Sequence, residues 1–299
     1  MRSARSIDAC WWLLGLLSLP GSTAAAGEAR LAAAIPGIEA RIRDSGAEVA
    51  VAFETLDAHA RWLTRADEPF HAASTMKVPV LIELYKERRD GSLRLEDALP
   101  VRNEFHSLAD GSTFALDPAD DSESDLYLAI GSTRTLAQLS ELMITVSSNL
   151  ATNLLIERLG IDNIRSGVRA LGADGMQVLR GVEDSKAFEK GLNNTTTARA
   201  LLTLMEAIAH GEAVDVEASR QMQAILERQT FNDGIPAGLP PGTRVAHKTG
   251  EITRIQHDAG IVFAPRPFVL VVLTQGIADP KQSAALIADI TRQLYAATQ

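Results

Sequence analysis

The sequence predicts a mixed α/β fold of the α+β kind, with an antiparallel sheet and terminal helices built from both chain ends and an all-helical lobe inserted between them. Segments of alternating apolar residues lie near both ends of the chain, whereas the middle shows the spacing of amphipathic helices. Neither β-rich end can bury its apolar face alone, so both are expected to join one sheet.

The N-terminal region predicts one helix and two strands. A helix is expected over 28–43, where apolar residues recur at helical spacing. Residues 48–54 alternate around Val49, Val51 and Phe53, which is typical of a strand. Residues 61–64 are expected to return as a second strand.

The middle of the chain predicts helices and the tail predicts strands. The expected helices cover 78–89, 136–146, 150–159, 198–210 and 216–229. Strands are expected over 245–251, 259–264 and 268–274, followed by a helix over 283–297. We therefore expect a sheet lobe from 27–72 and 218–299 and a helical lobe from 73–217, which together form one domain.

Two stretches lack regular periodicity, 101–134 and 180–194. The first contains five acidic residues between positions 117 and 125. It is expected to be an exposed insertion or lid, and the alternative is a solvated loop with no role in substrate binding.

The composition and the N-terminus predict an exported globular protein. Hydrophobic residues make up 46% and charged residues 22%, and the net charge is −9, so no nucleic-acid partner is predicted. Residues 1–26 read as a signal peptide, with Arg2 and Arg5 before an apolar segment and three alanines at its end. That segment is too short for a mature membrane anchor. We expect a periplasmic or secreted monomer; an uncleaved interfacial helix is the alternative.

Cysteine and histidine usage predicts neither a metal nor a cofactor. The only cysteine, Cys10, lies inside the expected signal peptide, so the mature chain would have no disulfide and no thiolate ligand. His71, His106 and His247 do not have the spacing of a metal site.

Ser74 and Lys77 are the main chemical candidates. Residues three apart at the start of a helix lie on one face, so the Lys77 amine can reach the Ser74 hydroxyl. Such a hydroxyl is a weak nucleophile until a neighbouring base takes its proton. Pro79 is tolerated only near the first turn, which places Ser74 at or just before the helix start, where backbone N–H groups favour negative charge.

Three short motifs occur in a fixed order. They are Ser74-Thr75-Met76-Lys77, Ser147-Ser148-Asn149 and Lys248-Thr249-Gly250. This set resembles the S-x-x-K, S-D-N and K-T-G motifs of the serine β-lactamase and penicillin-binding protein superfamily. The second and third motifs are 101 residues apart, which is similar to the class A-like β-lactamase branch. The first and second are 73 apart, and the acidic insertion accounts for the longer spacing.

The resemblance implies how a reaction would proceed. Ser74 would attack the carbonyl of a lactam, peptide or ester and become acylated, and Lys77 would take its proton directly or through water. Ser147 would relay a proton to the leaving nitrogen, with its hydroxyl between two lysines. The backbone N–H groups of Ser74 and Glu251 would hold the oxyanion.

The resemblance also implies a set of substrate-binding residues. Asn149 would hydrogen-bond Lys77 or a substrate amide. Lys248 and Thr249, with Gly250 completing the motif, would clamp a substrate carboxylate. Because the whole chain is net negative, an anionic substrate requires such a local positive pocket.

The chain departs from the family pattern at two places. Ser148 replaces the aspartate of the second motif, for which we expect a local change in hydrogen bonding and little loss of chemistry. Glu183 is implied as the deacylation base, and Asp184 is a competing acid. Ala187 stands where the family has an asparagine that helps to hold the deacylating water.

Several assignments stay open at this point. A rearranged loop would let Asn193 or Asn194 supply the missing amide. The alternative to Glu183 as the deacylation base is that it forms a surface ion pair with Arg180 or Lys186.

Three residues beside the expected pocket also have alternatives. Arg254 is either a second anion contact or a solvent-facing strand residue. Phe105 and Phe114 form either an aromatic wall beside the pocket or part of the core.

The function implied is a serine β-lactamase that hydrolyses the β-lactam ring through a Ser74 acyl-enzyme and confers antibiotic resistance. The alternatives are a penicillin-binding-protein-like D,D-peptidase or esterase, a slowly deacylating β-lactam-binding serine hydrolase, and a non-catalytic sensor of β-lactams or muropeptides. The partner is a small-molecule β-lactam or a peptidoglycan-like substrate. A working deacylation base would decide between these functions.

Overall fold

The computed structural model describes the backbone of residues 21–299 and the side chains of residues 27–299. The expected signal peptide therefore lies mainly outside the described residues, and its last part falls in the first helix, α1 (Gly21–Ser45). Within residues 21–299, none of the helices combines the length and the apolar character needed to cross a bilayer.

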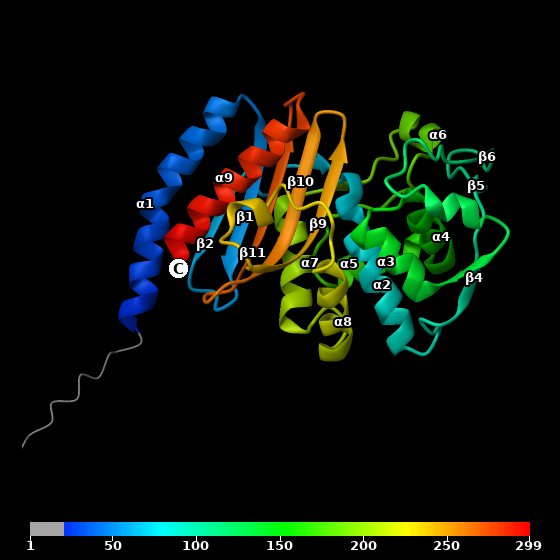
Figure 1. Ribbon diagram of the computed structural model, residues 1–299, viewed down its shortest axis with the longest axis horizontal. Helices are drawn as coiled ribbons and strands as arrows, with labels where there is room; N and C mark the ends of the chain where they lie inside the picture. The colour runs from blue at the N-terminus through cyan, green and yellow to red at the C-terminus, as the bar shows by residue number, and fades with distance from the viewer. Residues whose placement is uncertain (1–20) are drawn as a thin grey trace, which may run out of the picture.

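One five-stranded antiparallel sheet joins the two ends of the chain, in the order β2-β1-β11-β10-β9 (Figure 1). The strands are β1 (Glu48–Thr55), β2 (Arg61–Thr64), β9 (Arg244–Ile252), β10 (Ile255–Phe263) and β11 (Phe268–Gln275). The register of β1 against β11 pairs Glu48 with Gln275. The prediction that both ends build one antiparallel sheet is confirmed.

Helices cover both faces of this sheet because its strands are apolar on both sides. In β1, Val51 and Phe53 pack towards α1 and α9 (Pro280–Thr298), whereas Ala50 and Ala52 belong to the core on the other face. The terminal helices α1 and α9 lie side by side (Figure 1). Opposite them, α7 (Ala198–His210) packs on β1, β10 and β11, although it falls within the segment expected for the helical lobe.

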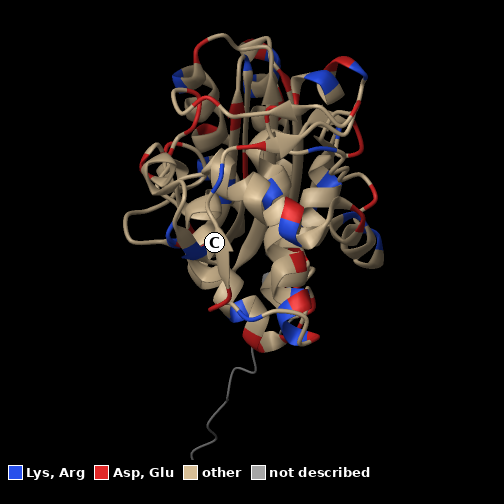
Figure 2. Cartoon of the chain, turned by 90° about the vertical axis from the view of Figure 1, so that its right-hand side faces the viewer, with Lys and Arg blue, Asp and Glu red and all other residues tan. Residues whose placement is uncertain are grey.

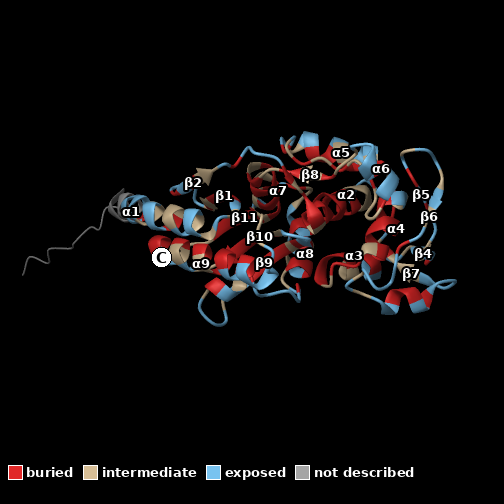
Figure 3. Ribbon diagram, turned by 90° about the horizontal axis from the view of Figure 1, so that it is seen from above, coloured by how far each residue is buried: buried red, intermediate tan, exposed pale blue. Residues whose placement is uncertain are grey.

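The remaining helices form the lobe beside the sheet. They are α2 (Lys77–Arg89), α3 (Leu136–Thr145), α4 (Asn149–Leu159), α5 (Ile161–Ala170), α6 (Ser185–Glu189) and α8 (Val216–Leu226). Helix α2 contacts α3, α4, α5 and α8 and is buried from Lys77 to Tyr85 (Figure 3). A helix surrounded in this way carries its first residues to the interior, where the two lobes meet.

The 101–134 segment is more ordered than the sequence indicates. Two-residue and three-residue strands form the pairs β4 (Ala98–Pro100) with β7 (Thr133–Thr135) and β5 (Phe105–His106) with β6 (Thr113–Phe114). The segment also contains the 3₁₀ helix η2 (Asp125–Ala129). Strands β3 (Phe70–His71) and β8 (Thr195–Thr196) form a similar short pair. Such short strands carry no periodicity that a sequence pattern could reveal.

Candidate active site

Ser74 lies in the 3₁₀ turn η1 (Ala73–Met76), which leads directly into α2. The turn is fixed by local hydrogen bonds: the Ala73 N–H donates to His71 Nδ1 at 3.0 Å, and the Thr75 hydroxyl donates to the Ala72 carbonyl at 2.6 Å. Ser74 lines a cavity of about 560 Å³ between the two lobes. The expected position at the start of the helix is confirmed.

Lys77 lies beneath this cavity and is fully buried. Its amine donates to the Ser147 carbonyl at 2.5 Å, the Ser147 hydroxyl at 3.1 Å and Asn149 Oδ1 at 2.9 Å. No hydrogen bond joins it to Ser74 in the described part of the chain. Burial lowers the pKa of Lys77 to about 7, although the carboxylates of Asp121 and Glu183 act in the opposite direction. A large fraction of the amine is therefore neutral near pH 7 and able to accept a proton.

The Ser147 hydroxyl lies between two amines. It accepts from Lys77 at 3.1 Å and from Lys248 at 3.0 Å, and the Lys248 amine also donates to the Thr249 carbonyl. Lys248 is fully buried, and burial together with the neighbouring Lys77 charge lowers its pKa. Two ammonium groups this close would repel each other, so the arrangement favours the neutral form of at least one of the two lysines. The Ser147 hydroxyl between them can then transfer a proton.

The backbone holds Ser147 in a strained conformation between α3 and α4. Its φ is 60°, in the left-handed region that a non-glycine residue rarely adopts. The Ser148 hydroxyl caps α4 by accepting from the Ala151 N–H at 3.2 Å. The Asp121 carboxylate accepts from the Asn149 N–H at 2.9 Å and the Leu150 N–H at 2.9 Å.

Asp121 is a residue of the site that the sequence patterns did not indicate. It belongs to the acidic run at 117–125, but nothing in the sequence pairs one of those five acids with a turn 27 residues later. The Ser148 hydroxyl lies 3.4 Å from the Asp121 carboxylate, which the insertion supplies to this turn.

Strand β9 passes close to Ser74 because residue 250 is glycine. A Cβ at Gly250 would lie 3.2 Å from the Ser74 backbone nitrogen and 3.2 Å from the Ala73 Cβ. Such contacts would push the strand away from the turn. Glycine therefore lets the backbone of the third motif lie beside Ser74, as an oxyanion site built from both segments requires. Glu251, at the end of β9, is exposed and lines the same cavity.

Arg254 is at the rim of the cavity, in the turn between β9 and β10. Its φ is 60°, and its guanidinium donates to the Gly276 carbonyl. This position suits a second contact for an anionic substrate, and the side chain does not lie within a strand.

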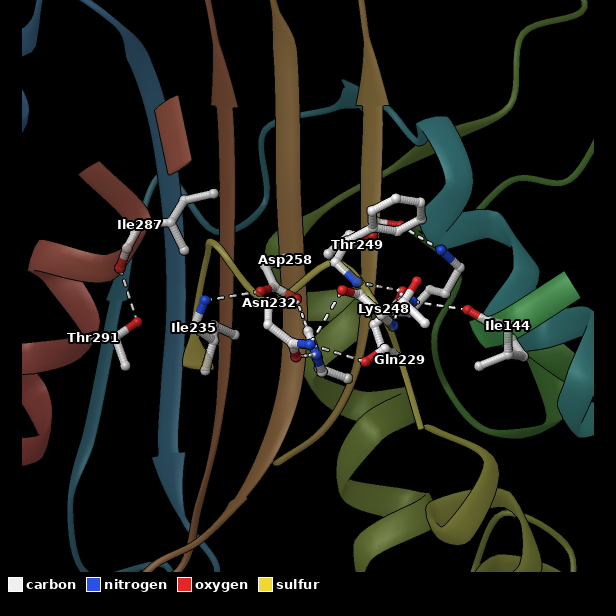
Figure 4. A network of polar contacts seen from close by, with 12 residues as sticks. Ile144, Gln229, Asn232, Ile235, Lys248, Thr249, Asp258, Ile287 and Thr291 are labelled. Atoms are coloured by element: carbon white, nitrogen blue, oxygen red, sulfur yellow. Dashed lines mark hydrogen bonds and ion pairs between the residues drawn. The ribbon is translucent and has the colours of Figure 1, made fainter. Parts of the chain in front are cut away.

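A polar network joins β9 and β10 to the segment that follows α8 (Figure 4). His247 Nδ1 lies 2.9 Å from the Asp258 carboxylate, which also accepts from the Ile235 N–H at 2.9 Å. Gln229 Nε2 donates to the Ile144 carbonyl at 2.8 Å. The segment after α8 is thus tied both to the sheet and to α3, next to the turn that carries Ser147.

Glu183 faces Asn149 and Lys77. It accepts from Asn149 Nδ2 at 2.9 Å, and burial raises its pKa. Asn149 thereby bridges Lys77 and Glu183. The alternative of a surface ion pair with Arg180 or Lys186 is wrong, because Lys186 pairs with Asp110 at 3.0 Å and the Arg180 guanidinium donates to the Gly181 carbonyl.

Asp184 points away from this centre. Its buried carboxylate caps α6 through the Ala187 N–H at 3.0 Å and accepts from the Ser107 hydroxyl at 2.7 Å and the Leu108 N–H at 3.0 Å. The Asn194 amide is also occupied, since it accepts from the Leu179 N–H and donates to the Arg180 carbonyl. These two side chains hold the loop, and of the adjacent acids only Glu183 is linked to Lys77, through Asn149.

Phe105 and Phe114 pack together with ring centroids 5.8 Å apart. They line a separate cavity of about 580 Å³ between the insertion and α4 and α5, with Leu108 and Ile156. Packing within the lobe, rather than a wall beside Ser74, is therefore their role. Among the residues that the structure describes, no group of three or more His, Asp or Glu side chains could hold a metal ion.

The chain belongs to the β-lactamase enzyme family, because the family model of that description matches residues 31–298. A β-lactamase of Bacillus licheniformis is 31% identical over 172 residues, which cover 53% of this chain and 54% of that relative. The chain thus spans about half the length of this curated relative in the alignment.

Two solved structures share the fold over most of both chains. The crystal structure of a β-lactamase from Sphaerobacter thermophilus has a TM-score of 0.74 and 27% identity, covering 90% of this chain and 96% of that one. A mutant of PBP-A, described as an acyl-enzyme complex with penicillin G, has a TM-score of 0.75 and 28% identity, covering 88% and 95%. The fold and the superfamily expected from the three motifs are confirmed.

The two adjacent acids should differ sharply in their effect on stability. Asp184→Ala removes three hydrogen bonds at a buried carboxylate, one of which is the cap of α6, so we expect the free energy of unfolding to fall by about 2 kcal/mol or more. Glu183→Gln keeps an acceptor for Asn149 and removes a carboxylate that burial disfavours, so the loss should stay below about 1 kcal/mol. Urea unfolding of both variants checks this, and the reverse ranking would contradict it.

Proposed function

We propose that this protein is a serine β-lactamase that hydrolyses the lactam ring through an acyl-enzyme on Ser74. The observation that carries the proposal is the Ser147 hydroxyl held between Lys77 and Lys248, with Asn149 linking the same Lys77 to Glu183. This arrangement serves both a proton relay for acylation and a base for deacylation.

In the acylation step, the neutral Lys77 amine takes the proton of the Ser74 hydroxyl, directly or through water. The Ser74 oxygen attacks the lactam carbonyl carbon, and the developing oxyanion is held by backbone N–H groups of η1 and β9. When the carbon–nitrogen bond breaks, Ser147 donates its proton to the ring nitrogen. The proton on Lys77 then returns to Ser147 over 3.1 Å, which leaves the amine neutral again.

In the deacylation step, the Glu183 carboxylate takes a proton from a water molecule that attacks the ester of Ser74. Its position beside Asn149 and the rise of its pKa by burial suit a general base. The ester bond to Ser74 breaks, and the proton returns to the serine oxygen. Turnover therefore depends on Glu183, whereas acylation does not.

The substrate proposed is an anionic β-lactam. Thr249 lines the cavity and Arg254 is at its rim, whereas Lys248 is buried behind Thr249. Elsewhere acidic and basic residues are mixed over the surface, and the chain as a whole is net negative (Figure 2). A carboxylate would therefore be held beside the Thr249 hydroxyl and drawn to the Arg254 guanidinium.

A second candidate function is a stably acylated, penicillin-binding-protein-like enzyme. The observation that favours it is the similarity to PBP-A, whose mutant structure is an acyl-enzyme complex. The two functions share acylation of Ser74 and differ in deacylation, so the position of Glu183 favours the hydrolase.

The test follows a chromogenic cephalosporin and the intact mass of the protein. Wild-type protein should turn over continuously without accumulating an adduct, because Glu183 deacylates Ser74. Glu183→Gln should accumulate one adduct per chain with turnover reduced by about 100-fold or more, and Ser74→Ala should form none.

Glu189→Gln serves as the matched control, because Glu189 is an exposed acid on α6, close to Glu183 in the sequence. It should behave as wild type. A stable adduct on wild-type protein would overturn the hydrolase in favour of the second candidate, and no adduct on any variant would overturn both.

We propose in addition that the protein is exported by a signal peptide at 1–26 and confers resistance on the cell that exports it. The positive start, the apolar segment and the terminal alanines support the proposal. N-terminal sequencing of the periplasmic protein should begin at Gly27, whereas cytosolic protein that retains Met1 would contradict export.

A further inference from the structure

The 101–134 insertion contributes to the active site at two neighbouring residues. The Asp121 carboxylate accepts from the backbone at the start of α4. Ser122, the next residue in the chain, lines the cavity together with Ser74. An insertion that only covered the site as a solvated loop would make none of these contacts.

The Asp121 carboxylate accepts hydrogen bonds from several groups of the turn and of η2. Besides the Asn149 and Leu150 N–H groups, it accepts from the Tyr127 hydroxyl at 3.0 Å and lies 3.4 Å from the Ser148 hydroxyl. Tyr127 is buried, and burial and Asp121 raise its pKa, so it remains a donor. The carboxylate is thereby held against the N-terminus of an 11-residue helix, where negative charge is favourable.

We propose that Asp121 is a positioning residue of the catalytic centre, whose carboxylate holds the Ser147–Asn149 turn in place and supplies the negative charge that this turn lacks. The inference rests on the proposed function and deepens it. Asp121 touches neither the nucleophile nor Lys77 by a hydrogen bond, so it acts through the turn and through its charge. Its neighbour Ser148 is the residue that stands where the family motif has an acid.

The charge of Asp121 acts on Lys77 together with other groups from several elements. The ionisable groups that influence Lys77 or its two charged partners are Asp121, Glu183, Lys248, Asp258 and Asp120. Asp121 and Glu183 favour the ammonium form of Lys77, and burial disfavours it. Removing the Asp121 charge should therefore lower the pKa of Lys77 further, below about 7.

The test is the pKa of Lys77, read from the ¹³Cε shift of labelled lysine as pH is varied in the whole mature protein. Asp121→Asn should lower this pKa by about one unit and slow acylation of Ser74 by about tenfold or more, because the turn is held less well. Asp125→Asn removes the same charge from the same segment, at an exposed residue of η2, and should change neither value.

A rescue variant separates positioning from general stability. Ser148→Asp added to Asp121→Asn returns a carboxylate to the turn, at a residue whose hydroxyl lies 3.4 Å from the Asp121 carboxylate, and it should restore the Lys77 pKa and the acylation rate. Ser148→Asp alone places two carboxylates together and should lower the melting temperature. Each substitution alone is therefore expected to be harmful, whereas the second should compensate for the first in the double variant.

Three results would overturn the proposal. An unchanged Lys77 pKa in Asp121→Asn would do so, even if the melting temperature falls. A double variant that restores neither the pKa nor the folded state of Asp121→Asn would also do so, as would an equal effect of Asp125→Asn. Because the Lys77 titration needs no turnover, absence of acylation in wild-type protein would overturn the proposed function and leave the test of Asp121 readable.

Discussion

The rest of the site depends on one interaction, in which the buried amines of Lys77 and Lys248 share the Ser147 hydroxyl. Lys77 and Lys248 both donate to Ser147, and neither is exposed to solvent. Charged amines in such a place would cost several kcal/mol each, so burial drives them towards the neutral form. The surrounding residues supply hydrogen-bond acceptors for both amines and exclude solvent from them.

The fold brings the three motifs together from distant parts of the chain. Helix α2 is surrounded by other helices, so its first turn reaches the interior, and β9 is the edge strand of the sheet nearest to that turn. Gly250 then permits close approach of the two backbones. The turn before α4 completes the group from the helical lobe.

Backbone strain collects at this junction. Of the six non-glycine residues with positive φ in the described chain, four lie in or beside the site: Ala73, Ser147, Glu183 and Arg254. Each such conformation costs on the order of 1–3 kcal/mol and persists only where surrounding contacts impose it. Here the contacts include hydrogen bonds from the Ala73 N–H to His71, from Lys77 to the Ser147 carbonyl and from Asn149 to Glu183.

The sequence predicted the sheet, the position of Ser74 and the three motifs, because each rests on local periodicity or on spacing within a few residues. The sequence could not show which of Glu183 and Asp184 faces the site. The two acids are adjacent, and the backbone conformation of the loop decides the direction of each side chain. The role of Asp121 could not be predicted, because the two N–H groups that it binds at the start of α4 are distant in sequence and belong to the backbone. The short strands of the insertion, such as β5, have too few residues to show a pattern.

The central claim is that Lys77 is the base that activates Ser74, and the pH dependence of acylation by wild-type protein tests it most directly. Since the amine must be neutral to accept a proton, single-turnover acylation should rise with pH, with a midpoint near 7, and level off above it. A rate that is constant between about pH 5 and 9, or that rises with the midpoint near 10 of an ordinary lysine, would contradict the account.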